Sequence, residues 1–119
     1  MKMSIPLRLD AWSNLRGHWR TLEKRKRKEK DVTSTALMFH DKPPLPIVVT
    51  FTRISIRNLD DDNLPTAFKY VRDTIALAYG THDGPSAPIR WAYRQRKPLI
   101  SEPRHGFEVE IEHEPEAQP

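Results

Sequence analysis

Residues 47–80 read IVVTFTRISIRNLDDDNLPTAFKYVRDTIALAYG. The first ten residues are rich in β-branched and aromatic side chains, which favour strands. Apolar and polar residues alternate from Val49, and we expect the later members, Ile54 and Ile56, to change face across a bulge. Residues 58–62 are polar turn material. The opening part of the stretch therefore predicts a strand that ends in a turn.

The rest of the stretch predicts a helix over residues 64–79. At about 100° per residue, its apolar side chains fall on one face that can pack on a sheet, namely Leu64, Phe68, Val71 and Ile75. Pro65 suits the first turn of a helix and would be costly further in. Gly80 suits the C-terminal cap. The order of strand, turn and helix indicates a helix that lies against a sheet.

Four further elements extend this unit. The apolar run Ile5–Leu9 predicts a first strand, and the composition from about Arg16 to Phe39 predicts a helix. Alternating apolar residues predict two last strands, at residues 89–94 and 107–111, the second near an edge. The order β-α-β-α-β-β gives an α+β fold, one mixed sheet with two helices packed on it. We expect one domain over residues 1–112 and a flexible tail over residues 113–119.

The composition limits the kind of protein. A chain of 119 residues has room for one modest core. It has no cysteine, which excludes disulfides and thiolate metal sites. No apolar stretch approaches the roughly 18–20 residues that span a bilayer, so we expect an intracellular protein with no membrane partner. The net charge of +4 suits a polyanionic partner, and basic residues crowd into residues 16–30 and 90–104.

The run Asp60-Asp61-Asp62-Asn63 needs a physical reason. Three adjacent carboxylates repel one another unless a cation or hydrogen-bond donors offset their charge. Capping of the helix that begins at Leu64 would account for one of these carboxylates. Binding of a metal ion is the alternative that would account for the others. An EF-hand does not fit, because Pro65 stands where that loop needs glycine. Magnesium suits the run better, since it accepts a few carboxylates and takes its other ligands from water and phosphate.

Three further charged residues relate to this acidic run. Lys69 and Asp73 lie on the same helix face as Asp62, within a turn or two of any phosphate bound there. A surface ion pair with Lys69 explains Asp73 more simply than a role in orienting that lysine. Asp83, in the loop after Gly80, supplies a third carboxylate if the loop folds back.

This pattern is similar to a known family. The matching residues are the run Asp60–Leu64, then Phe68, Asp73, Ala76, Gly80 and Asp83. They resemble the RusA-like endonucleases, which are Holliday junction resolvases with Asp-x-Asp-Asn-Leu at a helix start and another acid after the helix's closing glycine. The resemblance covers residues 57–97. It implies a homodimer in a bacterial cytoplasm, encoded by the bacterium or a phage, that nicks four-way DNA junctions with Mg²⁺ or with Mn²⁺ in its place.

The resemblance also implies site residues. The family's paired acids map onto Asp60 and Asp62, and its later acid maps onto Asp83. These three would hold the metal and form the catalytic centre. Asp61 occupies the variable middle position of the motif.

One position departs from the family. Thr66 stands where the family has a lysine, and Lys69, about one turn further along the same face, is the candidate to replace it as the catalytic cation. Asp83-Gly84 stands where an acidic pair is common.

Basic side chains would supply phosphate contacts that do not depend on DNA sequence. Trp91 and Tyr93 are expected in the core rather than stacked on bases. The candidate residues for nucleic-acid binding are Arg16, Arg20, Lys24, Arg25, Arg27 and Lys28 in the first helix, and Arg90, Arg94 and Lys97 around the third strand.

Two other functions stay open because the family lysine is displaced. One is a non-catalytic DNA-binding phage or prophage protein of the same fold, whose acids only cap the helix. The other is a structural or assembly protein with a basic arm, which would show no preference for junctions.

Overall fold

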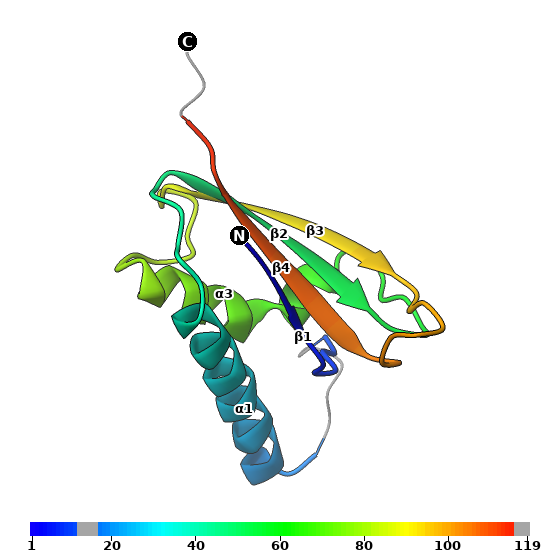
Figure 1. Cartoon of the computed structure of the whole chain (residues 1–119). Helices are drawn as coiled ribbons and strands as arrows, with labels where there is room; N and C mark the ends of the chain where they lie inside the picture. The colour runs from blue at the N-terminus through cyan, green and yellow to red at the C-terminus, as the bar shows by residue number, and fades with distance from the viewer. Residues whose placement is uncertain (12–16, 116–119) are drawn as a thin grey trace.

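A four-stranded mixed sheet carries the fold, with the helices on one of its faces (Figure 1). The computed structural model describes residues 1–11 and 17–115. The elements in chain order are β1 (Lys2–Ile5), α1 (Trp19–Met38), β2 (Ile47–Ile54), α2 (Leu64–Ala67), α3 (Lys69–Ala78), β3 (Ile89–Arg96) and β4 (Gly106–His113). The predicted α+β class is confirmed, with α2 and α3 together in the place of the second predicted helix.

The sheet topology places the acidic residues in one connection. The strand order is β1-β4-β2-β3, in which β2 and β3 are parallel and the other neighbours are antiparallel. Parallel neighbours need a crossover connection, and residues 55–88, which include α2 and α3, provide it. Asp60, Asp62 and Asp83 all lie in this crossover.

Aromatic packing joins the crossover to the sheet. Phe51 in β2 and Phe68 between α2 and α3 are fully buried, with ring centroids 4.5 Å apart. Trp91 and Tyr93 stack on Phe51 from β3, and Phe107 of β4 meets Phe68 edge-on. As predicted, Trp91 and Tyr93 pack against the hydrophobic core. These contacts hold the crossover on the sheet face that the helices cover.

The first and last strands differ from the predictions. The first strand is Lys2–Ile5 rather than Ile5–Leu9, because Pro6 has no N–H to donate to a strand ladder. The last strand lies between β1 and β2, so the prediction of a position near an edge is wrong. The glutamates that alternate along β4 face the side of the sheet without helices. Such alternation marks an open sheet face and does not distinguish an edge strand from a central one.

The second strand and second helix also differ in detail. β2 keeps one register against β3 and β4 from Ile47 to Ile54, so the predicted bulge is absent from this strand. Ile56 lies beyond the strand and is exposed. The helix predicted over residues 64–79 is interrupted at Phe68, which ends α2 and precedes α3. The ring of Phe68 is seated on Phe51 at this break, so tertiary packing rather than helix propensity dominates there.

A buried arginine fastens the N-terminal segment to the sheet. Arg53 in β2 is 3% exposed, and it donates hydrogen bonds to the carbonyls of Leu9 at 2.8 Å and Arg57 at 2.7 Å. Its guanidinium also lies 3.6 Å from Asp10, which forms a 3.1 Å ion pair with Arg25 of α1. Burial lowers the pKa of Arg53, and the nearby carboxylate of Asp10 opposes that change. Asp10 thus links α1 to β2.

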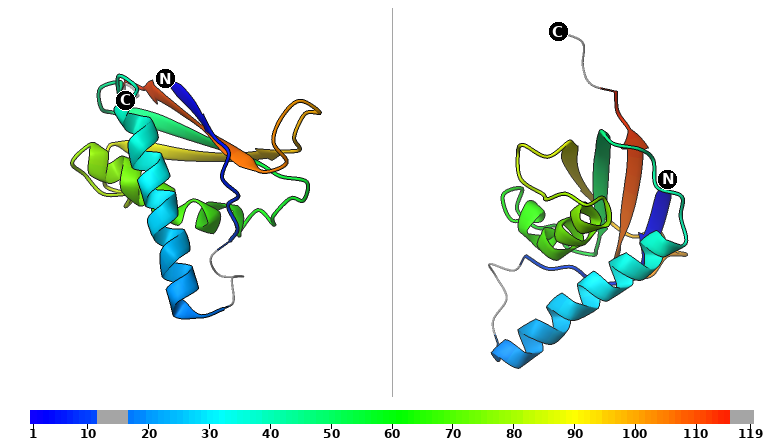
Figure 2. Two further views of the ribbon diagram at one scale, coloured as in Figure 1. Left: turned by 60° about the horizontal axis from the view of Figure 1, so that its bottom comes forward. Right: turned by 90° about the vertical axis from the view of Figure 1, so that its left-hand side faces the viewer.

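The first helix extends beyond the sheet (Figure 2). Its N-terminal cap is His18, whose Nδ1 accepts the backbone N–H of Arg20 at 3.1 Å. One row of α1 is buried, made of Glu29, Thr33 and Leu37. None of the helices in the described ranges is both long enough and apolar enough to cross a membrane.

Gly80 closes α3 as the sequence predicts. Its φ of +71° is in the left-handed region that favours glycine. The N–H of Gly80 donates to Leu77 at 2.9 Å and the N–H of Thr81 donates to Ala76 at 3.0 Å, which is the Schellman arrangement. The chain reverses here, and this reversal sends Asp83 back along α3.

Replacing Phe68 should test the role of the aromatic packing. We expect Phe68→Ala to destabilise the protein by about 3–5 kcal/mol, because it removes a fully buried ring and leaves a cavity. Urea unfolding measures the change. The control is Leu77→Ala in α3, where the side chain is 76% exposed and the expected change is within about 0.5 kcal/mol. Similar losses in both variants would contradict a central role for this stack.

Candidate functional site

The acidic run lies in the turn between β2 and α2. The backbone carbonyl of Asp60 accepts N–H groups from Asn63 at 2.9 Å and Leu64 at 3.0 Å, so the backbone closes this turn. The side chains of Asp60, Asp61 and Asp62 are exposed, and their carboxylates form no hydrogen bond or ion pair with any residue in the described ranges. No side-chain hydrogen bond caps α2 at Asn63. The carboxylates are therefore accessible to a cation from solvent.

Arg72 brings Asp83 back to the start of α2. Its Nε lies 3.4 Å from Oδ2 of Asp83, and its Nη1 donates to the carbonyl of Pro65 and to the hydroxyl of Tyr93, the latter at 3.0 Å. One guanidinium therefore connects α2, β3 and the loop after α3. The guanidinium of Arg72 therefore bridges the carboxylate of Asp83 and the first turn of α2. This turn directly follows the acidic run.

Asp73 is the partner of Asp83 that the sequence does not reveal. Burial is the main reason that the pKa of Asp73 rises, and the negative charge of Asp83 and a hydrogen bond with it act in the same direction. The positive charges of Lys30 and Arg72 oppose the rise. Two neighbouring carboxyl groups of this kind favour a shared proton or a bound cation. The contact depends on the path of residues 80–83, which local spacing does not define.

Lys69 is exposed on α3, and its ammonium lies 5.4 Å from the ring centroid of Tyr70. The expected ion pair between Lys69 and Asp73 is not among the ion pairs of the described residues. Thr66, at the family's lysine position, donates its hydroxyl to the carbonyl of Asn63 at 2.8 Å. Thr66 therefore stabilises the local turn, and Lys69 remains the nearby helix cation.

The crossover contains the type of ligand atom that magnesium binds. Carboxylate oxygens are the protein ligands that this ion prefers, and the crossover supplies two groups of them, the exposed Asp60 and Asp62 and the neighbouring Asp73 and Asp83. Within the described ranges, no three Asp, Glu or His side chains converge into a ready-made metal cluster. His82 is engaged locally, because its Nδ1 accepts the N–H of Gly84 at 3.0 Å.

The basic residues of α1 fall into two kinds. Arg25 is tied to Asp10, and the guanidinium of Arg20 lies 5.3 Å from the ring centroid of Trp19. The cations of α1 that are exposed and form no ion pair with a described residue are Arg20, Lys24, Arg27 and Lys28. Arg16 lies outside the described residues. Two lysines and two arginines of the sequence-predicted surface on α1 are thus exposed and outside ion pairs with described residues.

The cations around β3 are divided in the same way. Arg90 forms two hydrogen bonds with Glu114, at 2.9 and 2.6 Å, whereas Arg94 and Lys97 are exposed. Since Trp91 and Tyr93 face the core, alternation puts Arg90 and Arg94 on the opposite sheet face. The helices do not cover that face, so these arginines and the cations of α1 do not form one continuous surface.

The same open face carries a network around Arg96. Its guanidinium binds Glu102 at 2.6 and 2.8 Å and Glu108 at 2.7 Å, and Lys2 lies 2.9 Å from Glu108. The hydrogen bond from Arg96 is the main reason that the pKa of Glu102 falls to about 2. The network fastens the loop after β3 to β4 and β1.

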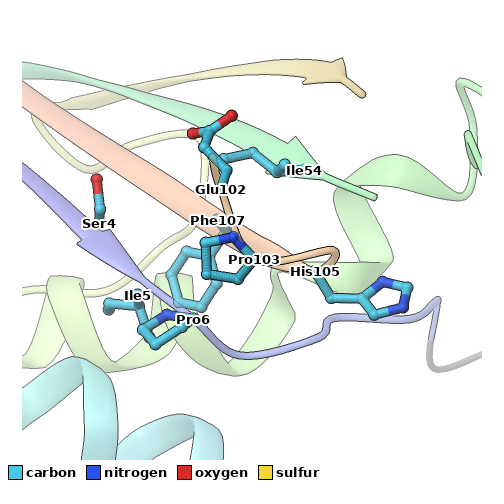
Figure 3. Close-up of a pocket in the computed structure, with 9 residues that line it drawn as sticks. Ser4, Ile5, Pro6, Ile54, Glu102, Pro103, His105 and Phe107 are labelled. Atoms are coloured by element: carbon cyan, nitrogen blue, oxygen red, sulfur yellow. The ribbon is translucent and has the colours of Figure 1, made fainter. Parts of the chain in front are cut away.

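An apolar hollow of about 260 Å³ lies beside this network (Figure 3). Its walls include Ile5, Pro6, Ile54 and Phe107, and His105 at its rim lies 3.0 Å from the hydroxyl of Ser55. None of the residues predicted to act in catalysis or nucleic-acid binding lines it. The candidate site is therefore the polar crossover and not this hollow.

Comparisons with known protein families, with curated proteins and with solved structures found no match for this chain.

The network around Arg96 predicts a pH dependence. The pKa of Glu102 drops from 4.5 to about 2 on folding. In that interval the folded protein binds fewer protons than the unfolded chain, so stability falls as the pH falls through it. We expect Glu102→Gln to lose less stability than wild type between pH 4.5 and 2, as measured by urea unfolding at each pH.

Glu112→Gln is the matched control for this experiment, because Glu112 is exposed on the same face of β4 as Glu108. It should keep the wild-type pH dependence. Parallel curves for Glu102→Gln and wild type would show that the network does not stabilise the fold.

Proposed function

We propose that the protein is a magnesium-dependent endonuclease that cleaves Holliday junctions or other branched DNA by phosphodiester hydrolysis. The observation that carries the proposal is the return of Asp83 to the first turn of α2, where Arg72 holds it near the acidic run. The resemblance to RusA-like endonucleases pairs these same acids. The proposed partner is a four-way DNA junction, and the proposed assembly is a homodimer in a bacterial cytoplasm.

Asp60, Asp62 and Asp83 would hold the metal ion, with Mn²⁺ as an alternative to Mg²⁺. When bound, the ion supplies Lewis acidity that activates water and stabilises charge on the phosphate oxygens. Asp73 adds a fourth carboxylate beside Asp83 and strengthens the preference of this end of the crossover for a cation. Exposure of Asp60 and Asp62 leaves them accessible to a DNA strand approaching from solvent.

The positioning of these acids depends on Arg72. It contacts α2, β3 and Asp83 at once, so it restricts the loop after α3 without blocking Asp60 or Asp62. Lys69, exposed on α3, would offset the negative charge that develops on the phosphate during hydrolysis. The unpaired cations of α1 would contribute phosphate contacts that do not depend on sequence.

Asp62→Asn should greatly reduce the rate of cleavage, whereas Asp61→Asn should retain most of it. Both variants lose one carboxylate from the same exposed turn, but Asp61 is at the variable position of the motif. We expect Asp62→Asn to lower the rate at least ~100-fold, the order seen when one preorganised charge-stabilising group is removed. The assay follows a labelled synthetic four-way junction in Mg²⁺ and in EDTA, with linear duplex as the control substrate.

Paired nicks in Mg²⁺ that disappear in EDTA and in Asp62→Asn would support the enzyme and its site. Equal loss of cleavage in Asp61→Asn would assign the effect to the charge of the turn rather than to specific ligands. Salt-sensitive junction binding without cleavage by any of the three proteins would overturn the enzyme proposal. The non-catalytic DNA-binding protein of the same fold would then be the better account.

A further inference from the structure

Three lysine ammonium groups surround one aromatic ring where α1 packs on α3. The ring belongs to Tyr70, and its centroid lies 5.1 Å from Nζ of Lys26, 5.7 Å from Nζ of Lys30 and 5.4 Å from Nζ of Lys69. We call Lys26, Lys30 and Lys69 the lysine triad. Two helices that are distant in the sequence therefore place three positive charges around a single side chain.

The helical repeat explains the arrangement. Lys26 and Lys30 are four residues apart and lie on one face of α1, and Lys69 directly precedes Tyr70 at the start of α3. The contact between α1 and α3 brings the two groups together. Because all three ammonium groups are near one centroid, they lie within roughly 11 Å of one another, close to the screening length of about 10 Å in 0.1 M salt.

This arrangement is electrostatically incomplete. Each lysine is attracted to the face of the half-buried ring, but the three positive charges repel one another. None of the triad forms an ion pair with a residue in the described ranges. Negative charge bound beside these lysines would offset the repulsion.

The triad adjoins the proposed cleavage site. Lys69 and Asp73 are one turn apart on α3, and Lys30 is near enough to Asp73 for its charge to act on that carboxyl. Asp73 in turn contacts Asp83. A polyanion whose charges repeat along a chain can place one phosphate at the acids and another at the lysines, whereas a single small anion can reach only one of these positions.

We propose that Lys26 and Lys30 of α1 bind the backbone phosphodiester of the DNA next to the one that is hydrolysed, while Lys69 of α3 contacts the scissile phosphate itself. This inference rests on the proposed nuclease function and deepens it. Lysine suits the role because it acts as a point charge that approaches a phosphate from several directions. The triad then sets the path of the DNA strand across the surface where α1 and α3 meet.

The test variant is Lys26→Gln/Lys30→Gln, which removes two cations of α1 and leaves Lys69 and every acidic residue unchanged. The matched control is Lys42→Gln. The ammonium of Lys42 also lies over a tyrosine, 5.6 Å from the centroid of Tyr79, and Lys42 donates to the carbonyl of Ala78 at the far end of α3. It has the same chemistry without the other two lysines.

Junction binding is measured by fluorescence anisotropy in EDTA over a range of NaCl concentrations. The measured quantity is the slope of the logarithm of the association constant for the junction against log[NaCl]. In Lys26→Gln/Lys30→Gln we expect this slope to become shallower by about 0.9 for each phosphate that the variant no longer neutralises. Lys42→Gln should keep the wild-type slope, and Lys26→Arg/Lys30→Arg should restore it. Thermal unfolding of the glutamine variant should remain cooperative, which shows that a change of slope is not caused by loss of the fold.

The outcomes separate this inference from the proposed function. Cleavage by wild type with an unchanged slope in Lys26→Gln/Lys30→Gln would overturn the triad as a phosphate site and leave the nuclease intact. A shallower slope without cleavage by wild type would support the triad and overturn the nuclease. Stabilisation of wild type by inorganic phosphate, absent in the glutamine variant while the DNA slope stays unchanged, would overturn the assignment to DNA in favour of a free phosphate.

Discussion

The stack of Phe68 on Phe51 holds the crossover between β2 and β3 against the sheet, and the candidate site depends on where that crossover lies. Because β2 and β3 are parallel, the chain has to pass over one sheet face between them. Phe68 fixes that passage at its midpoint, where α2 ends and α3 begins. The acidic run precedes Phe68 in the crossover and Asp83 follows it. The position of this one buried ring therefore influences where both groups of acids lie.

Arg72 then connects the two ends of the crossover. Its contacts with Pro65 and Tyr93 determine where its guanidinium lies, and that guanidinium restricts Asp83. The Schellman turn at Gly80 supplies the reversal that lets the chain reach it. Partly buried carboxylates are costly when they are close together. The fold nevertheless places Asp73 beside Asp83, and the positive charge of Arg72 offsets part of the repulsion between them.

The basic residues divide according to their chemistry. Arginines form many of the structural contacts, as Arg25 and Arg53 do with Asp10 and Arg96 does with two glutamates. The planar guanidinium is suited to such fixed, multiple hydrogen bonds. Lysines of α1 and α3 stay outside these networks, and three of them surround Tyr70. Net charge alone suggests a polyanionic partner, whereas this division indicates which cations are available to bind one.

Local sequence patterns were sufficient to predict most of the helices and strands and the acidic character of the candidate site. Alternation in β2, β3 and β4 and the apolar face from Leu64 to Ile75 reflect periods of two and 3.6 residues that hold wherever one side of an element is buried. The acids at residues 60–62 and the glycine at residue 80 were recognisable because caps and turns are local. Four other features emerge only when the chain is folded: the central place of β4, the break at Phe68, the contact of Asp73 with Asp83, and the proximity of Lys26 and Lys30 to Lys69. Each of these depends on contacts between residues distant in the sequence, which local propensity and spacing do not encode.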